Sequence, residues 1–382
     1  MTNFFTGFYS GMSMALMIGY AILIFRYVRF WQTLPSWSMP EIWSPKTSVS
    51  IIVPARNESE DIIACLESIV LQNYPFDLFE IIVVDDHSED DTFEKVNALI
   101  SKKESFKISL LTSKGQGKKA ALEAGINFAS GELIATTDAD CLVPENWLNL
   151  LVSFYEKHNS KFIAAPVNFH NEESLLEKFQ SLDYMGMMLI TGAGIHGKFG
   201  WMSNGANLAY PKAVFEELNG FSGIDQVASG DDMLFMQKVV KKYPGQIGFI
   251  KNRKATVHTK AKSTWASFLQ QRIRWASKTG AYKQPQLVGT QTFVFLYCAF
   301  IFLGFPLAFS GINHVLLSFA GLIIVKYIID FFFLKRSSSF FNRNELMKAF
   351  LIAEWMHTVY IFLTGLSSVF RKKHSWKGRK VR

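Results

Sequence analysis

Long segments without charged residues constrain this chain most, because they fit a lipid bilayer better than a water-soluble core. Residues 1–25 contain no Asp, Glu, Lys or Arg, and residues 284–325 form a second uncharged segment. A helix needs about 20 apolar residues to cross a bilayer. We therefore predict a spanning helix at residues 8–27 and further membrane helices between residues 284 and 370.

The second membrane region is interrupted in ways that limit its division into helices. Pro306 and the polar stretch at residues 310–314 favour a break between two helices. Four ionisable residues lie inside the helices that would follow, namely Lys326, Asp330, Glu354 and His357. Such groups are costly within a bilayer, and Gly365 begins a Gly-Leu-Ser-Ser sequence suited to ending a helix. We therefore predict that residues 347–370 are re-entrant or lie along the cytoplasmic membrane surface.

Basic residues predict how the chain is oriented in the membrane. Arg26 and Arg29 follow the first apolar segment, and residues 371–382 hold seven Lys or Arg and no acidic residue. Because basic flanks favour the cytoplasmic side, we expect the central region and the tail to be cytoplasmic, in a multi-pass protein of a bacterial plasma membrane. The tail accounts for nearly all of the formal net charge of +8, so the composition does not indicate a nucleic-acid-binding face.

This pattern divides the chain into five parts. They are a first membrane helix at residues 1–28, a connector at 29–45, a cytoplasmic domain at 46–283, a membrane region of two to three helices at 284–370, and a basic cytoplasmic tail at 371–382. The connector carries Trp31, Trp37 and Trp43 among several prolines, a composition suited to the headgroup level of a membrane. The domain at residues 46–283 is long enough for one sizeable core.

Short apolar runs alternate with helical patterns through the first half of this domain. The apolar runs are residues 49–53, 80–84, 108–111 and 132–136, and the helical patterns between them are residues 60–72, 91–102 and 118–129. Continuous apolar strands joined by helices predict an α/β fold with a mostly parallel sheet covered on both faces. Such sheets bind ligands at the carboxyl ends of their strands, where this chain places several acidic residues.

Two pairs of aspartates follow predicted strands. Asp138 and Asp140 share a face of an extended chain, and together they suit a hard divalent cation beside a diphosphate; a solvated strand end is the alternative. Asp85 and Asp86 are adjacent carboxylates that could accept hydrogen bonds from a base and from ribose hydroxyls. The alternative is that this segment serves to cap the following helix, through Ser88 or Asp90.

Two helix starts carry further candidates. Lys118 follows Gly117 at the start of a predicted helix, where a lysine reaches a phosphate beside the helix N-terminus, unless it is a surface charge. Asp231 and Asp232 precede another helical pattern. A placed carboxylate there suits the general base that would deprotonate a sugar or lipid hydroxyl, and helix capping is the alternative.

The segment at residues 271–275 combines an amide, cations and an indole. Gln271, Arg274 and Trp275 share one face of a predicted helix, which suits a phosphate and a sugar; a membrane-surface helix is the alternative. Residues 179–195 are rich in Met and other apolar side chains. They form either part of the core or a bilayer-facing surface that guides a lipid acceptor.

In order and spacing, these clusters resemble the processive-type family 2 glycosyltransferases, membrane enzymes with a GT-A fold. That family includes cellulose and hyaluronan synthases and the ceramide and carotenoid glycosyltransferases. The resemblance rests on residues 49–58, 84–88, 117–122, 138–140, 204–207, 230–232 and 271–275. It covers residues 47–278, about 60% of the chain. The resemblance therefore implies a GT-A fold, Rossmann-like with a mixed, mostly parallel sheet, flanked by transmembrane helices.

The resemblance also implies site roles. The nucleoside pocket would be lined by Ala55, Arg56, Glu58 and Asp86, with support from Asp85. Lys118 would lie near the nucleotide, Asp138 would touch ribose or diphosphate, and Asp138 and Asp140 would bind Mn²⁺ or Mg²⁺. Asp232 matches the catalytic base and Asp231 its support, while Gln271, Arg274 and Trp275 match the motif that holds the diphosphate and the acceptor. His258 is either a third metal ligand or an exposed strand histidine.

The implied reaction is an inverting, metal-dependent transfer of a sugar from a nucleotide-diphosphate sugar, with a UDP-sugar favoured, to a lipid or membrane-associated acceptor. The alternative is a processive polysaccharide synthase that extends and extrudes a glycan. Three or four helices, however, are few to enclose a channel for a polymer. A transporter and an inactive scaffold are alternatives from other classes. An assay of nucleotide-sugar transfer separates these possibilities.

Overall fold

The chain forms two compact units in the computed structural model, which describes residues 2–103, 105–224, 230–276, 284–309, 311–370, 374–376 and 379–381. The first unit comprises Met1–Thr33, Glu172–Gly200 and Ala261–Lys372. The second comprises Leu34–Asn171, Trp201–Lys260 and Lys373–Arg382. Glu172–Gly200, from inside the expected domain at residues 46–283, groups with the long helices in this division, and the expected domain bounds stay a prediction.

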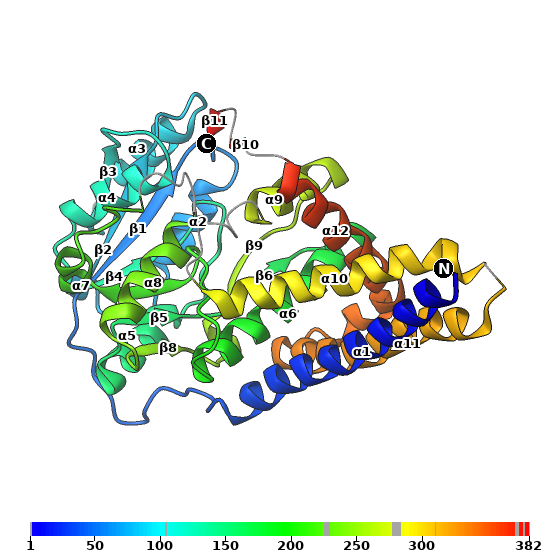
Figure 1. The fold of residues 1–382 in the computed structure, drawn as a ribbon. Helices are drawn as coiled ribbons and strands as arrows, with labels where there is room; N and C mark the ends of the chain where they lie inside the picture. Colours follow the sequence, from blue (N-terminus) through cyan, green and yellow to red (C-terminus); the bar gives the residue numbers. More distant parts are fainter. Residues whose placement is uncertain are drawn as a thin grey trace. The chain divides into compact units, whose positions relative to one another are not determined.

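A seven-stranded sheet forms the core of the second unit, in the order β3-β2-β1-β4-β7-β5-β8 (Figure 1). Its strands are β1 Val49–Ala55, β2 Phe79–Asp85, β3 Ile108–Thr112, β4 Leu133–Thr136, β5 Phe162–Ala164, β7 Leu208–Pro211 and β8 Ile247–Phe249. Only β7 runs antiparallel to its neighbours β4 and β5 in this sheet. The other pairings are parallel, which confirms the predicted α/β class and mostly parallel sheet.

Helices pack onto the sheet because its strands are apolar on both faces. The helices of this unit are α2 Ile62–Val70, α3 Thr92–Lys102, α4 Lys118–Phe128, α5 Trp147–His158, α7 Lys212–Glu217 and α8 Asp231–Lys242. In α4, Gly125 allows the close approach, since a Cβ there would lie 2.7 Å from Ile52 and 3.0 Å from Val84. The three predicted helices at residues 60–72, 91–102 and 118–129 correspond to α2, α3 and α4.

Smaller elements complete the second unit. Strands β6 Val167–His170 and β9 Val257–Lys260 form a parallel pair, and β10 His374–Trp376 pairs antiparallel with β11 Arg379–Val381. Short 3₁₀ turns lie at η1 Phe76–Leu78 and η2 Arg253–Ala255. Residues 371–373, 377–378 and 382 of the predicted basic tail lie outside the described residues.

The first unit is built from helices. They are α1 Thr2–Thr33, α6 Leu175–His196, α9 Trp265–Ala276, α10 Pro285–Ala308, α11 Asn313–Phe341 and α12 Phe350–Phe370, with the 3₁₀ segment η4 Asn344–Ala349 before α12. Four segments within α1, α10, α11 and η4–α12 are long and apolar enough to cross a membrane. This confirms the membrane-protein composition inferred from the uncharged segments.

Helices α1 and α11 run in the same direction along each other (Figure 1). The Ser10 hydroxyl donates to the carbonyl of His314 near their starts, the Tyr20 hydroxyl donates to Asp330 at 2.6 Å in the middle, and the rings of Trp31 and Phe340 meet near their ends. The predicted break after α10 is present, but Pro306 does not cause it. Pro306 lies inside α10, which continues to Ala308, although a proline has no N–H to donate to the carbonyl four residues earlier.

The sequence predicts a break at Gly365, but α12 continues through this residue to Phe370. A single helical glycine costs only about 1 kcal/mol, which the surrounding packing offsets. The first turns of α12 meet the second half of α11, where the rings of Tyr327 and Phe331 make edge-to-face contacts with Phe350. A later turn meets the first half of α10, since Phe362 stacks on Phe295. Helix α12 therefore lies across the other long helices rather than along them (Figure 1).

The tryptophans of the expected connector lie in different surroundings. Helix α1 continues to Thr33, so Trp31 is part of a helix and packs within the first unit. Trp37 and Trp43 instead bind α5, donating to the Ser153 hydroxyl and to the Glu156 carboxylate. The indole N–H groups thus find protein acceptors, and the headgroup-level position of the connector stays a prediction.

The Met-rich segment at residues 179–195 forms core. It lies on α6, which begins with a capping box between Ser174 and Glu177 and packs against α1, α11 and α12. A Cβ at Gly186 would lie 3.1 Å from both Phe333 and Leu334, so the helix backbones approach closely there. The apolar face of α6 is therefore used for packing within the first unit.

Candidate functional site

The carboxyl ends of β1, β2 and β4 meet at one edge of the sheet because these strands are adjacent and parallel. Ala55 at the end of β1 is paired with Asp85 at the end of β2. Thr136 at the end of β4 is paired with Ile52, three residues before Ala55. The segments that follow these strands hold most of the residues that the sequence singled out, so the fold places them at one edge.

Asp85 and Asp86 bind backbone amides in the structure. The Asp85 carboxylate accepts from the amide of Ser88 at 3.1 Å, and the Asp86 carboxylate accepts from the amide of Gly117 at 3.0 Å. Gly117 has a φ of +93°, a conformation that favours glycine, and it precedes α4. Asp86 therefore holds the loop after β2 against the start of α4. The sequence did not reveal that Gly117 supplies the amide for this contact.

Neighbouring Asp90 takes part in starting the next helix. Its carboxylate accepts from the amide of Thr92, the first residue of α3. Although partial burial opposes ionisation, hydrogen bonds from Thr92 and Ser59 lower the pKa of Asp90 to about 2. Capping of this helix, the alternative considered for the Asp85–Asp86 pair, thus falls to Asp90.

Arg56 is buried and shapes the loop after β2. One of its terminal nitrogens donates to the carbonyls of Asp86 and His87, at 2.8 and 2.5 Å, and the other pairs with Glu89 at 3.0 Å. Ala55 is buried at the strand end, and the carbonyl of Glu58 accepts from the amide of Ile62 in α2. These contacts define the walls beside Asp86.

A cluster of three aspartates and one lysine lies beyond the end of β4. Lys118 pairs with Asp138, and a Cβ at Gly205 would lie 3.0 Å from the lysine nitrogen and 3.7 Å from an Asp231 oxygen. Although burial opposes its charge, Asp138 and Asp231 raise the pKa of Lys118. The glycine therefore leaves the space in which this cation and the carboxylates approach one another.

Asp232 is held at the start of α8. Gly230 has a φ of +83°, so the chain turns sharply before the helix and places both aspartates in its first turn. The Asp232 carboxylate accepts from the amides of Gly205 at 2.9 Å and Met233 at 2.8 Å. Gly205 is itself fixed to β4, since its carbonyl accepts from the Thr136 hydroxyl. The catalytic candidate is thus oriented by the backbone.

A possible cation site lies beside this cluster. Ligand atoms of Asp138, Asp140 and Cys141 lie within 4.8 Å of one another. Burial, with added repulsion from Asp140, raises the pKa of the Cys141 thiol well above its usual value, so the sulfur stays protonated. The two carboxylates are the hard oxygen donors that Mg²⁺ and Mn²⁺ prefer. His258 lies on β9, with its ring 6.1 Å from that of His170, and is not part of this group.

The residues of the 271–275 motif lie on α9, in the first unit. Trp275 packs among side chains of that unit, with its ring 6.1 Å from that of Tyr184 and the Arg272 guanidinium 4.4 Å above it. Arg272 in turn pairs with Asp183 of α6 at 3.0 Å. The sequence did not single out Asp183 or Arg272. Asp183 could have been found from the sequence, because it is an acidic residue within the apolar, Met-rich segment at residues 179–195.

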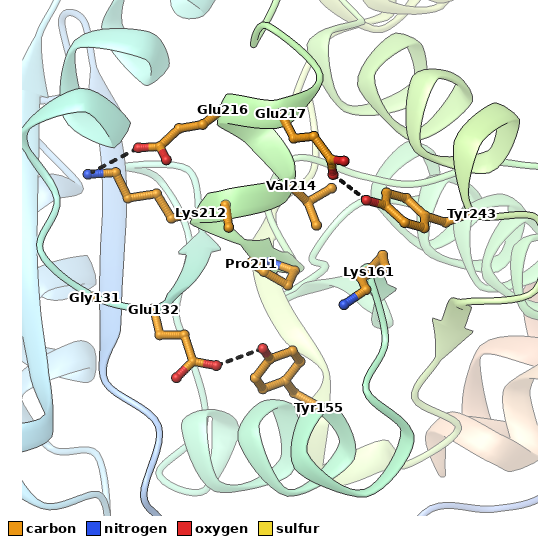
Figure 2. Close-up of a pocket in the computed structure, with 11 residues that line it drawn as sticks. Gly131, Glu132, Tyr155, Lys161, Pro211, Lys212, Val214, Glu216, Glu217 and Tyr243 are labelled. Atoms are coloured by element: carbon orange, nitrogen blue, oxygen red, sulfur yellow. Dashed lines mark hydrogen bonds and ion pairs between the residues drawn. The ribbon is translucent and has the colours of Figure 1, made fainter.

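A separate hollow lies at the opposite edge of the sheet (Figure 2). It has a volume of about 380 Å³ and is lined at the start of β4 and the end of β7. Most of its ionisable groups bind one another, since Tyr155 donates to Glu132, Tyr243 donates to Glu217 and Lys212 pairs with Glu216. These contacts favour a structural role for the hollow rather than a ligand site. It lies at the other end of the strands from the aspartate cluster.

Sequence comparison matches part of the chain, including most strands of the seven-stranded sheet, to a known family. A family model described as "Glycosyl transferase family 2" matches residues 50–219. The chain is 33% identical over 141 residues to glycosyltransferase AglE of Haloferax volcanii, covering 36% of this chain and 46% of that protein. It is 34% identical over 175 residues to an undecaprenyl-phosphate 4-deoxy-4-formamido-L-arabinose transferase of Yersinia enterocolitica, covering 44% and 50%. The chain thus spans about half the length of the curated relatives it matches.

Comparison with solved structures supports the same fold. The chain superposes on the mannosyltransferase PcManGT from Pyrobaculum calidifontis, a structure in complex with GDP-Man and Mn²⁺. The TM-score is 0.61 at 18% sequence identity, over 95% of this chain and 99% of that chain. Together with the sheet order, this similarity confirms the GT-A fold. The chain therefore carries a family 2 glycosyltransferase domain, within residues 50–219.

Proposed function

We propose that the chain transfers a sugar from a nucleotide-diphosphate sugar to a lipid-linked acceptor at the membrane, with inversion at the anomeric carbon. The observation that carries the proposal is the aspartate cluster of Asp138, Asp231 and Asp232 beyond the carboxyl end of β4. Asp138 lies within the residues matched to the family 2 model, and the other two aspartates follow them. The name of the Yersinia relative includes an undecaprenyl-phosphate acceptor, and the four long apolar helices suit a lipid acceptor.

Asp232 acts as the general base in this proposal. Its carboxylate accepts the proton of the acceptor hydroxyl while the acceptor oxygen bonds to the anomeric carbon. The bond between that carbon and the diphosphate oxygen breaks in the same step, which inverts the configuration. The amides of Gly205 and Met233 orient the carboxylate, so little rearrangement is needed. Asp231 supports it from the same helical turn, and Lys118 supplies a positive charge toward the departing diphosphate.

Asp138 and Asp140 fit a divalent cation, because their oxygens lie close together in a cluster with more carboxylates than cations. A bound Mn²⁺ or Mg²⁺ would offset the negative charge of the diphosphate leaving group. The nucleoside would lie beside Asp86, within walls formed by Ala55, Arg56 and Glu58 and supported by Asp85. Gln271, Arg274 and Trp275 would hold the diphosphate and the acceptor end.

Transfer of label decides between this proposal and its alternative. Purified full-length protein with native lipids is incubated with a panel of labelled UDP-sugars and GDP-sugars. Label in the organic phase supports transfer to a lipid, whereas label in a high-molecular-weight polymer supports a processive polysaccharide synthase. Absence of transfer from every donor would contradict both.

Replacing Asp140 by Ala is expected to abolish cation-dependent nucleotide binding, because removing one of two carboxylates leaves the diphosphate charge poorly neutralised. Calorimetric titration with UDP or GDP, with and without Mn²⁺, measures the effect independently of turnover. Asp77→Ala, an exposed change in η1, is the matched control and should bind like the unaltered protein. Full activity of the unaltered protein in excess EDTA would contradict the cation assignment.

The basic tail is expected to lie on the cytoplasmic side of the membrane, because α12 is expected not to cross it. The oblique path of α12 supports this proposal, and the basic residues after it favour the cytoplasmic face. A cysteine at Ser375 should resist an impermeant thiol reagent in intact cells, whereas one at Asn313, the first residue of α11, should react. The three native cysteines are buried and give little background. Labelling at residue 375 from outside would show that α12 spans.

A further inference from the structure

A series of buried ionisable side chains crosses the first unit. The Lys326 ammonium of α11 lies between Asp330 of the same helix and Glu354 of α12, donating to Asp330 at 2.6 Å and to Glu354. Its third contact is His357 Nδ1 at 3.2 Å. The Tyr20 hydroxyl of α1 donates to the other oxygen of Asp330. Three helices are thus joined around one lysine that is fully buried.

The series continues toward α9 through Asp183 of α6. His357 Nε2 lies 3.9 Å from one Asp183 oxygen, which also accepts from the Tyr360 hydroxyl at 2.9 Å. The other Asp183 oxygen lies 3.0 Å from the Arg272 guanidinium of α9. The side chains of Asp183 and Arg272 are only 6% and 4% exposed. The polar series therefore ends on the helix that carries the 271–275 motif.

Arg272 depends on Asp183 for its charge partner. The aromatic rings of Phe268, Trp275 and Tyr360 surround the guanidinium, whose centre lies 5.0, 4.4 and 5.9 Å from their centroids. Among the described residues, Asp183 is the single acidic side chain in an ion pair with it. A buried charge that loses its partner is strongly destabilising, so a rotation of α9 that separated the two side chains would be unfavourable.

We propose that Asp183 is a positioning residue that fixes the rotation of α9 through Arg272. The proposal rests on the proposed function, in which Gln271, Arg274 and Trp275 of α9 hold the diphosphate and the acceptor. Successive residues of a helix are about 100° apart, so one rotational setting of α9 brings Arg272 to Asp183 and determines where Gln271 and Arg274 point. Apolar packing alone tolerates sliding, whereas a buried ion pair defines the register.

The test compares Asp183→Asn with Glu172→Gln in the full-length protein. Glu172 is the control, because its side chain is 2% exposed and pairs at 2.7 Å with Arg343, a half-buried arginine of the same unit, and α9 takes no part in that pair. We expect Asp183→Asn to lower kcat by roughly 10- to 100-fold, the effect of a small misplacement of binding groups. Hydrogen exchange of the α9 amides should rise in this variant and not in Glu172→Gln. Asp183→Glu, which keeps the charge, should restore most of the protection and activity.

The exchange measurement keeps the inference separate from the proposed function. If the unaltered protein transfers no sugar, the proposed function fails, but protection of α9 still reports whether Asp183 positions the helix. Unchanged α9 exchange and unchanged kcat in Asp183→Asn would overturn the inference. Equal loss of activity and protection in Asp183→Asn and Glu172→Gln would also overturn it, because both changes would then act through general stability.

Discussion

Replacing Asp232 by Asn is expected to reduce sugar transfer by roughly 10²- to 10⁴-fold, the usual contribution of a general base. The amide has the same shape as the carboxylate and its oxygen still accepts from the Gly205 amide, but it has little affinity for a proton. Donor binding should therefore stay within a few-fold of the unaltered protein. Steady-state transfer rates, with nucleotide affinity measured by calorimetry, separate the two effects.

The control for this change is Asp77→Asn, which makes the same chemical substitution at an exposed position outside the cluster. It should leave both transfer and binding unaltered. Turnover by Asp232→Asn at the rate of the unaltered protein would show that another group accepts the proton. Loss of nucleotide binding together with transfer would instead assign Asp232 to the donor site.

Replacing Lys326 by Met is expected to destabilise the protein by about 3–5 kcal/mol, because two carboxylates would remain buried without a cation between them. Lys326 has no exposed surface, and it binds both Asp330 and Glu354. The thermal unfolding midpoint in detergent should fall by on the order of 10 °C. Lys348→Met, an exposed lysine in the adjoining η4 segment, should have little effect.

A compensated variant distinguishes charge from shape. Combining Lys326→Met with Asp330→Asn and Glu354→Gln removes the uncompensated charges, so much of the lost stability should return. An unfolding midpoint for Lys326→Met close to that of the unaltered protein would contradict the account of these ion pairs. Failure of the compensated variant to recover would assign the loss to packing instead.

The sequence predicted those features that depend on local pattern. Buried strands appear as continuous apolar runs, so β1 to β4 and the helices between them could be located from their periodicity. The parallel arrangement then placed the residues after β1, β2 and β4 at one edge, where the structure has them. β7 could not be foreseen as a reversed strand, because the direction of a short strand depends on the chain segments before and after it.

Long-range pairing accounts for most of what the sequence left open. Arg56 was expected beside a nucleoside, but its partners are carbonyls of the loop after β2, about thirty residues away. The cost of Glu354 in an apolar helix argued against a regular α12, yet Lys326 supplies its counter-charge from α11. Asp183 and Arg272 are separated by almost ninety residues, so neither signals the other in a single sequence.

The place of β7 between β4 and β5 has a consequence for how the protein is made. Strands β1 to β5 leave the ribosome before β7, which follows β5 by about 40 residues and is therefore synthesised roughly 2–8 s later at ordinary translation rates. Until then β4 and β5 lack the strand that joins them, so β4 has one unpaired edge, and β5, whose other neighbour β8 is made later still, has two. Helix α6, which belongs with the membrane helices, is made during the same interval. The nascent chain thus exposes open strand edges while a helix destined for the other unit emerges, a period in which chaperones would protect it.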